Sequence, residues 1–587
     1  MISKVERPAS EVADPPAPEW TSDAIAELLR RLDLPFISLN PGASYRGLHD
    51  SLVNYLGNDA PQLVLCLHEE HAVAVAHGYA KVAGRPMAVA LHSNVGLMHA
   101  TMALYNAFCD RVPMLALGAT GPVDADERRP WIDWIHTSAD QGALVRGYVK
   151  WDDQPASVKA ALEAVLRGHM LTCSYPSAPV YICLDAALQE APLDAAPVFP
   201  ALERHRPPAP PSPSAADVHR ALRLLSQAAH PLVLMGRVGR GEAEWEQRVA
   251  LAERLGAHVL TDLKVAAAFP SDHALHPAAP GTFLTSSGRE LVAHADVILS
   301  LDWVDLGGTL RQASAGAQVI SCTNDQALHN GWSKDHFELA PADLAITAHP
   351  DLLVTALLGE LDATAAPAPR SLPTPERDGG PPAAGPADGH ISMRRLAAAL
   401  NGAVAGGPAC LVRLPLGWDG SDLRTSHPLD YLGQDGGAGL GSGPGMAVGA
   451  ALALQGDDRL AVAVLGDGDL LMGAPALWTA AHYDLALLVV VANNRSFYND
   501  EVHQERVAQR RGRLVENRWI GQHIRDPEPD LAALARSLGL DGRGPVHAAD
   551  QLDDAVARAV AAARSGATVL LDVRVVPDGY PSGPSAS

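Results

Sequence analysis

Residues 459–500 decide the fold, and they read RLAVAVLGDGDLLMGAPALWTAAHYDLALLVVVANNRSFYND. Within this stretch, residues 461–465 and 485–492 are short apolar runs rich in valine and leucine, a pattern typical of buried parallel strands. Good helix formers at 474–483 predict a helix between the two strands. The stretch is therefore expected to form a strand–turn–helix–strand unit, the building block of a parallel α/β sheet.

Polar residues follow both strands of this unit. Gly466-Asp467-Gly468 comes after the first strand and Asn493-Asn494 after the second, and 24 residues separate the two motifs. Open parallel sheets bind ligands beyond the carboxyl ends of their strands, so both motifs are expected at one site. A carboxylate and an amide oxygen are hard ligands suited to Mg²⁺ or Ca²⁺ carrying a phosphate. The alternative is that the two motifs only form turns.

Together the two motifs resemble the diphosphate site of thiamin-diphosphate-dependent enzymes, which have Gly-Asp-Gly, a spacer of this length and Asn-Asn. The resemblance implies that Mg²⁺ is bound by Asp467, by the Asn494 side chain and by the Ser496 carbonyl. It also implies contacts to the cofactor in the same segment, at Gly466, Gly468, Asp469, Asn494 and Ser496.

A second motif, LCLHEEHAVAVAHGYAKVAGRP at residues 65–86, is similar to the cofactor-activating segment of these enzymes. There a glutamate at a strand-to-helix junction precedes Gly-Tyr-Ala, and alignment on Gly78-Tyr79-Ala80 places this glutamate at Glu69. The implied role is a carboxyl against N1′ of the pyrimidine, which favours the imino tautomer whose N4′ removes the thiazolium C2 proton. A buried carboxyl with a raised pKa suits this role. For Glu70 we prefer the alternative that it only complements a helix N-terminus.

Composition limits the possible functions. The chain has 587 residues, 47% of them hydrophobic, which is enough for two to four α/β domains. Its net charge of −22 argues against nucleic acid or an anionic membrane as a partner. No run approaches the roughly 18 apolar residues of a membrane-spanning helix. Scattered cysteines without a CxxC pattern, and an N-terminus without an apolar segment, predict an unprocessed cytoplasmic protein with reduced thiols.

The alternation of strands and helices predicts an α/β protein with three doubly wound parallel-sheet domains. A disordered tail is expected at 1–18, followed by domains at 19–195, 214–360 and 390–578, with a Pro/Gly/Ala-rich linker at 363–389. The resemblance implies that these domains are pyrimidine-binding, central and diphosphate-binding. The expected strands outside the opening stretch are 36–39, 63–67, 87–92, 112–117, 180–184 (closing the first sheet), 231–235, 258–261, 297–301, 318–321 and 569–576.

Residues near the expected cofactor indicate the kind of reaction. His92-Ser93 is similar to benzoylformate decarboxylase, whose histidine at this position is an active-site acid/base, whereas acetolactate synthases usually have Thr-Ser-Gly-Pro-Gly there. His276, followed by proline, is similar to a second active-site histidine of that decarboxylase. Residues 118–122 lack the glutamine that both relatives usually have at this strand end. Further catalytic or substrate-pocket positions are Ser44, Asn94, Asn499 and His503.

Two glycine-rich segments are candidates for ligand contacts. In residues 435–449, the resemblance implies that the Ala438 carbonyl accepts the 4′-amino group of the cofactor and that Leu440 supports its bent form. Residues 236–241 follow a strand and read GRVGRG, a turn that could hold a nucleotide phosphate. Relatives place FAD, ADP or nothing there, and we favour nothing because an isolated glycine pattern is a weak signal.

These features predict a thiamin-diphosphate- and Mg²⁺-dependent enzyme resembling acetolactate synthase and benzoylformate decarboxylase over about residues 20–578. The resemblance implies attack of the C2 carbanion on a 2-oxo acid, loss of CO₂ to an enamine, and then protonation or attack on a second carbonyl. His92 favours decarboxylation to an aldehyde. Acetolactate synthase-type carboligation, a 2-hydroxyacyl-CoA lyase and a non-catalytic cofactor-binding module are the alternatives. Because Glu69 and Asp467 lie in domains that come from different chains in this family, we expect a homodimer with shared sites, paired into a homotetramer.

Overall fold

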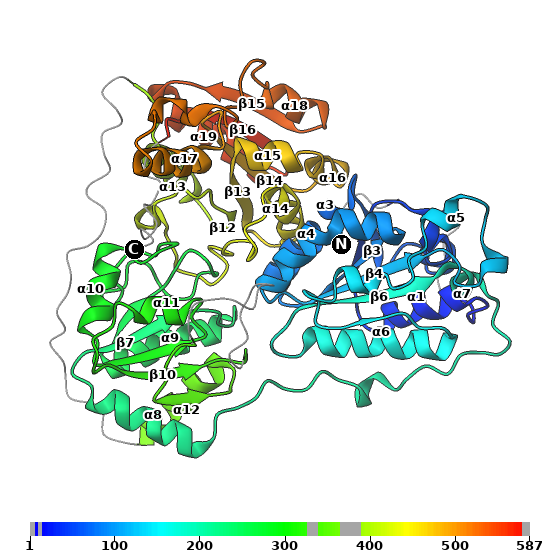
Figure 1. Ribbon diagram of the computed structural model, residues 1–587, viewed down its shortest axis with the longest axis horizontal. Helices are drawn as coiled ribbons and strands as arrows, with labels where there is room; N and C mark the ends of the chain where they lie inside the picture. Colours follow the sequence, from blue (N-terminus) through cyan, green and yellow to red (C-terminus); the bar gives the residue numbers. More distant parts are fainter. Residues whose placement is uncertain (1–5, 10–14, 326–338, 364–388, 578–587) are drawn as a thin grey trace.

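The computed structural model describes residues 6–9, 15–325, 339–363 and 389–577. Most of the linker expected at 363–389, and part of the tail expected at 1–18, lie outside the described residues. The described chain forms three parallel sheets with helices packed against them, which confirms the predicted fold class (Figure 1). No helix in these ranges is long and apolar enough to cross a membrane.

The first sheet has the strand order β2-β1-β3-β4-β6-β5. Its strands are β1 (Phe36–Leu39), β2 (Gln62–Leu65), β3 (Met87–Leu91), β4 (Met114–Thr120), β5 (Asp152–Asp153) and β6 (Pro179–Asp185). Its helices are α1 (Thr21–Arg31), α2 (Arg46–Asp50), α3 (Glu69–Ala83), α4 (Ser93–Cys109), α5 (Ile132–Ile135), α6 (Val158–Cys173) and α7 (Ala186–Glu190). The prediction that the strand at 180–184 closes the sheet is wrong, because β5 pairs outside β6. Two aspartates carry no apolar pattern that could have indicated a strand.

The central sheet has the order β11-β10-β9-β7-β8. Its strands are β7 (Pro231–Met235), β8 (His258–Leu260), β9 (Val297–Leu301), β10 (Gln318–Cys322) and β11 (Leu344–Ile346). Its helices are α8 (Ala215–Gln227), α9 (Glu242–Leu255), α10 (Ser286–His294), α11 (Leu306–Leu310) and α12 (Pro350–Ala363). The predicted strands at 231–235 and 297–301 match β7 and β9, whereas the three-residue β11 was not predicted.

The third sheet has the order β12-β13-β14-β16-β15 and contains the opening stretch. Its strands are β12 (Ala409–Arg413), β13 (Leu460–Gly466), β14 (Leu487–Asn493), β15 (Asp541–Val546) and β16 (Thr568–Arg574). Its helices are α13 (Met393–Val404), α14 (Ser442–Ala453), α15 (Asp467–Gly473), α16 (Ala476–His482), α17 (Tyr498–Arg510), α18 (Leu531–Ser537) and α19 (Ala549–Arg564). β12 and β15 were not predicted.

The prediction of one helix at 474–483 is wrong, because two helices lie between β13 and β14 and the first begins earlier than predicted. Helix α15 begins at Asp467, immediately after β13, and α16 follows at Ala476. Pro475 stands between them, and a proline has no N–H for the helical hydrogen-bond ladder. The Gly-Asp-Gly motif therefore lies at a strand-to-helix junction, where backbone N–H groups of the first helical turn lack helical partners.

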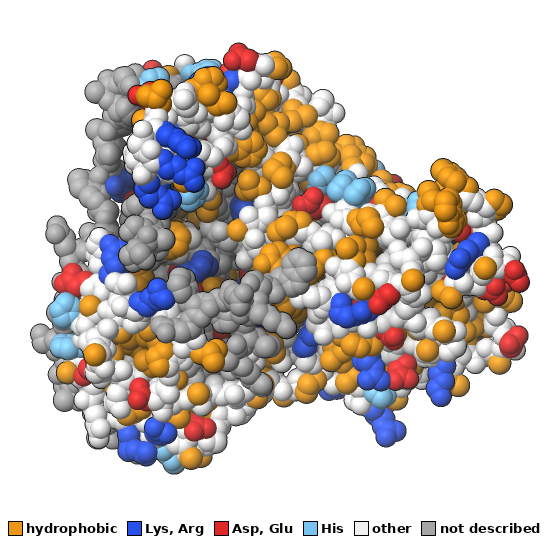
Figure 2. All heavy atoms as spheres, in the orientation of Figure 1, with side chains coloured by type: hydrophobic (Ala, Val, Ile, Leu, Met, Phe, Trp, Pro, Cys, Tyr) orange, Lys and Arg blue, Asp and Glu red, His pale blue; other side chains and the backbone are white. Residues whose placement is uncertain are grey.

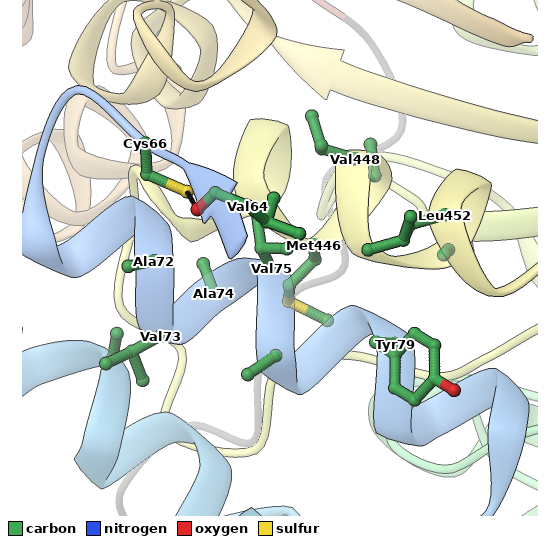
Figure 3. Close-up of a cluster of buried hydrophobic side chains, with 14 of the residues drawn as sticks. Val64, Cys66, Ala72, Val73, Ala74, Val75, Tyr79, Met446, Val448 and Leu452 are labelled. Atoms are coloured by element: carbon green, nitrogen blue, oxygen red, sulfur yellow. Dashed lines mark hydrogen bonds between the residues drawn. The ribbon is translucent and has the colours of Figure 1, made fainter. Parts of the chain in front are cut away.

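Helices α3 and α14 join the first and third domains into one hydrophobic core (Figure 3). A Cβ atom on Gly78 would lie 2.0 Å from the Met446 carbonyl oxygen, and one on Gly449 would lie 1.9 Å from the Val75 carbonyl oxygen. The two helices therefore touch through their backbones, which only glycine permits at these positions. This contact fixes the position of Glu69, at the start of α3, relative to the third domain.

All six cysteines lie within the described residues and are free, and five are buried. This agrees with the expectation of reduced thiols.

Candidate active site

Asp467 occupies the junction between β13 and α15 and is 3% exposed. Burial raises its pKa to about 6, against the opposing effect of backbone N–H groups of Gly468, Arg495 and Ser496 that face the carboxylate. Its Oδ2 atom is buried and has no hydrogen-bond partner among the described residues. A buried carboxylate oxygen without a donor is unfavourable unless a cation completes its environment. The carboxylate thus fits the predicted role of a metal ligand.

The segment after β14 brings the other predicted ligands to the same edge. The Asn494 side-chain oxygen accepts a hydrogen bond from the Ser496 N–H at 2.9 Å. The Ser496 hydroxyl donates to Glu501, a 3% exposed carboxylate that also lies 3.0 Å from Nε2 of His523. Sequence reasoning missed Glu501 and His523, which hold this loop in place. With Asp467, the oxygens of Asn494 and Ser496 form a donor set of the kind that Mg²⁺ prefers.

Asn493 does not belong to this loop. It is the last residue of β14, and its side-chain amide donates to Oδ1 of Asp572 on β16 at 2.9 Å. The expectation that both asparagines follow the strand is therefore wrong for Asn493, which helps to fasten two neighbouring strands.

The glycine-rich loop before α14 is held by a buried network of charges. Arg413, at the end of β12, pairs with the fully buried Asp435, and its Nε lies 3.6 Å from Oδ2 of Asp469. Asp435 accepts the Ala438 N–H at 2.8 Å, and Asp469 accepts the Gly441 N–H at 2.7 Å. The side chain of Asp469 is therefore used to fix the loop, which leaves its backbone for the predicted diphosphate contact.

Within the loop, Ala438 has a positive φ of 56°, and Leu440 is 38% exposed. A left-handed conformation is uncommon for a residue with a side chain, so the surrounding network has to enforce it. An exposed leucine beside this turn is available to a ligand, as predicted for the residue that supports the cofactor.

Glu69 occupies the junction between β2 and α3 and is 5% exposed. Nδ1 of His99, on α4, lies 3.0 Å from Oε2 of Glu69. A Cβ atom on Gly96 would lie 2.9 Å from Oε1, so the carboxylate is pressed against the backbone of α4. His99 was not predicted, although His92, Gly96 and His99 follow at i, i+4 and i+7, the spacing of one helix face.

His68 completes this cluster. Its Nδ1 accepts the Glu70 N–H at 3.2 Å and so caps α3, while its ring stacks on His99 with centroids 4.6 Å apart. Donor atoms of His68, Glu69 and His99 lie within 4.8 Å of one another, which is the residue set of a metal site. However, Glu69 Oε2 and one nitrogen of each histidine already take part in hydrogen bonds.

Glu70 is the second residue of α3 and lies near both Asp469 and His99. Burial and then the negative charge of Asp469 raise its pKa. A raised pKa is also the property expected of the activating carboxyl, so the structural role preferred for Glu70 stays a prediction.

Three predicted pocket residues lie together at the start of α4. Oγ of Ser44 is 2.9 Å from Nδ1 of His92 and accepts the Ser93 N–H at 3.0 Å. The Asn94 amide donates to the Ile135 carbonyl at 3.1 Å. Burial and then the nearby His136, which contacts the His92 ring edge-on, lower the pKa of His92 below 6.5. These surroundings favour the uncharged form of the ring, which can accept a proton.

A glutamine from another segment lies at the end of β4, although residues 118–122 contain none. The buried Gln141 donates from Nε2 to the Ala119 carbonyl at 3.0 Å and lies 2.7 Å from the Tyr181 hydroxyl. Its amide thus reaches the end of β4 from outside the strand, which no local sequence pattern indicates.

The remaining predicted site residues lie apart from Glu69. His276 is buried in the central domain, where Nε2 lies 3.0 Å from Oγ1 of Thr261 and the ring contacts Phe269. Asn499 and His503 both lie on α17, with His503 exposed. The structure joins Ser44, His92 and Asn94 into one group, but places His276 in a different domain.

The glycine turn after β7, at residues 236–241, is hydrogen-bonded to a side chain of the same domain. The Gly239 N–H donates to Oδ2 of Asp351 at 2.6 Å, and Asp351 also pairs with the buried Arg248 at 2.6 Å. A carboxylate therefore occupies the position at which a glycine turn of this kind would offer an N–H to a phosphate.

Comparison with known proteins agrees with this geometry. The chain matches the thiamine pyrophosphate enzyme N-terminal TPP binding domain over residues 19–144, the central domain over 218–354 and the C-terminal TPP binding domain over 418–573. The chain therefore belongs to the thiamine pyrophosphate-dependent enzymes.

Individual relatives are distant. The chain is 26% identical to an acetolactate synthase large subunit of Parasynechococcus marenigrum, over 90% of this chain and 84% of that protein. It is 25% identical to a benzoylformate decarboxylase of Pseudomonas aeruginosa, over 93% and 97%. A solved 4-hydroxybenzoylformate decarboxylase from Rhodococcus jostii shares the fold, with a TM-score of 0.75 and 23% identity, over 95% of this chain and all of that one.

Proposed function

We propose that this enzyme decarboxylates a 2-oxo acid to an aldehyde with thiamin diphosphate and Mg²⁺. The observation that carries the proposal is His92, a half-buried imidazole whose Nδ1 lies 2.9 Å from Oγ of Ser44, at the edge of the sheet where Glu69 lies. The benzoylformate decarboxylase among the relatives, which covers most of the chain, supports it.

The residues divide into three roles in this proposal. Asp467, Asn494 and Ser496 would hold Mg²⁺, which would neutralise the charge of the diphosphate, and the loop at Ala438 and Leu440 would hold the aminopyrimidine–thiazolium part. When bound, the cofactor supplies a carbon nucleophile and accepts the electrons released when CO₂ leaves. Glu69 exchanges a proton with the pyrimidine ring.

His92 stores or delivers a proton beside the reacting carbonyl, a positioned acid/base role typically worth about 10²–10⁴ in rate.

Acetolactate synthase-type carboligation is the second candidate, favoured by the acetolactate synthase large subunit among the relatives. A lyase that uses a nucleotide site in the central domain is less well supported, because Asp351 occupies the Gly239 N–H. For the same reason we propose that neither FAD nor ADP binds there. The intact pair of Glu69 and Asp467 argues against a module without catalysis.

A panel of 2-oxo acids tests the reaction. Purified protein, Mg²⁺ and thiamin diphosphate are incubated with each acid, and CO₂ and products are measured by mass spectrometry. CO₂ with the matching aldehyde supports the decarboxylase. A product containing the carbons of two carbonyl compounds identifies the carboligase, and no turnover of any acid contradicts both.

We further propose that two chains share each active site. Large apolar side chains are exposed beside Glu69 and the glycine-rich loop: Leu67 is 44% exposed, Met98 58% and Met472 56%. Figure 2 shows hydrophobic side chains gathered on this face over α15, α16 and α4. A contiguous apolar surface of this kind is typical of a protein interface. A second copy would cover it and bring its own diphosphate domain to Glu69.

Light scattering and activity at decreasing protein concentration test this assembly. A dimer, or a tetramer of dimers, should lose activity as it dissociates. A monomer with full activity at high dilution would contradict the shared site.

A further inference from the structure

His99 contacts Glu69, the glutamate proposed to activate the cofactor, and the family resemblance did not indicate this contact. Its Nδ1 lies 3.0 Å from Oε2 of Glu69, and its side chain is 48% exposed while that of Glu69 is 6% exposed. An ionised carboxylate only accepts hydrogen bonds, so His99 must be the donor and carry its proton on Nδ1. This tautomer leaves Nε2 on the more exposed side of the ring.

The orientation of the His99 ring is itself fixed. The ring stacks on His68 with centroids 4.6 Å apart and planes inclined by 23°. His68 cannot turn freely, because its Nδ1 accepts the Glu70 N–H at the start of α3. The α3 backbone thus orients His68, His68 orients the ring of His99, and His99 holds the carboxylate of Glu69.

The two oxygens of Glu69 consequently have different surroundings. Oε2 accepts from His99, whereas Oε1 lies beside Gly96 of α4 and has no hydrogen-bond partner among the described residues. We propose that His99 is a positioning residue, which engages Oε2 and so leaves Oε1 as the oxygen available for proton exchange with the cofactor. This inference rests on the proposed function of Glu69.

Paired substitutions separate this role from general packing. Asparagine carries its amide nitrogen at the same distance along the side chain as Nδ1 of histidine, whereas the amide nitrogen of glutamine corresponds to Nε2. His99→Asn should therefore keep the hydrogen bond to Glu69, and His99→Gln and His99→Ala should lose it. The partly exposed position of His99 makes all three variants compatible with folding.

The first measurement is the rate of C2–H exchange into deuterated water on the bound cofactor. We expect His99→Ala and His99→Gln to slow this exchange about tenfold, because hydrogen bonds to a charged group are stronger than those between neutral groups. In His99→Asn the exchange rate should stay within about twofold of wild type. Cofactor affinity by calorimetry should be unchanged in all three. Exchange at the wild-type rate in His99→Ala would overturn the inference. Exchange in His99→Asn that is no faster than in His99→Ala would also overturn it.

The second measurement needs no cofactor. In protein labelled with ¹⁵N-histidine, the His99 signal is identified as the one that disappears in His99→Asn. At alkaline pH this signal should show the Nδ1–H tautomer in wild type. In Glu69→Ala it should show the common Nε2–H tautomer instead. An Nε2–H tautomer in wild type would overturn the inference. If wild-type protein does not accelerate C2–H exchange over free cofactor, the proposed function of Glu69 fails instead, while the tautomer still decides the contact.

Discussion

Asp467 and Glu69 occupy equivalent places in two different sheets. Each is the first residue of a helix that follows a parallel strand, and their exposed fractions are 3% and 5%. Their partners differ. Backbone N–H groups surround Asp467 and leave one oxygen without a donor, whereas Glu69 meets a histidine ring nitrogen.

The difference shows how one position in a fold can serve two kinds of chemistry. Backbone N–H groups cannot change their charge, so the oxygen they leave free suits a metal cation. The His99 ring engages one oxygen of Glu69, so the other oxygen suits proton exchange with a ligand. The fold supplies the position, and the neighbouring groups decide its use.

Removing the Asp467 carboxylate should have the largest effect. In Asp467→Ala, we expect Mg²⁺-dependent binding of thiamin diphosphate to weaken by at least about 100-fold, because even outer partners of metal sites change affinity by about 10–100-fold. Calorimetry with and without Mg²⁺ measures this. Asp500→Ala, an exposed aspartate in the same domain, is the matched control. Unchanged affinity in Asp467→Ala would refute the metal site.

Replacing Glu69 should act on proton exchange and leave binding intact. Glu69→Gln keeps size and hydrogen bonding but cannot relay a proton, so C2–H exchange should fall by about 10²–10⁴ while the cofactor still binds. NMR of the bound cofactor follows the exchange. Glu70→Gln is the control and should stay nearly silent. A larger loss in Glu70→Gln would mean that the assignment has to be exchanged between the two glutamates.

Acid should weaken metal binding at Asp467. The folded protein without metal holds a proton on Asp467 up to about pH 6, and Mg²⁺ must displace it. Apparent Mg²⁺ affinity should therefore be constant above this pH and fall about tenfold per pH unit below it. Titrations between pH 5 and pH 8 measure this. In Asp467→Asn the remaining weak binding should lose this dependence, and an unaltered dependence would point to another group.

The smallest effect is expected at the cap of α3. His68 caps this helix through its ring, whereas no side-chain cap is present at α15. His68→Ala should lower the free energy of unfolding by about 1 kcal/mol, and His68→Asn, with a good capping residue, should recover most of it. Urea denaturation followed by circular dichroism compares them. Equal stability of the two variants would show that the cap contributes little.

Local sequence was sufficient for the parallel α/β class and for Asp467, which directly follows a buried strand whose carboxyl end is a place where ligands bind. Glu69 was located through the family resemblance, by alignment on Gly78-Tyr79-Ala80. The strands that were missed, β5, β11, β12 and β15, all lie at sheet edges. β5 and β15 carry little apolar pattern and β11 has only three residues, whereas β12 has an apolar run that was overlooked.

The partners of these carboxylates were decided only by the tertiary structure. His99 reaches Glu69 from the next helix, and Gln141 reaches the end of β4 from another segment. Arg413 on β12 joins Asp435, in the glycine-rich loop, to Asp469 on α15. Helical spacing on α4 was the only local signal for His99. A single sequence records which residues are adjacent in the chain, whereas these contacts depend on how α3, α4 and the third sheet pack, which is fixed by burial distributed over the whole shared core.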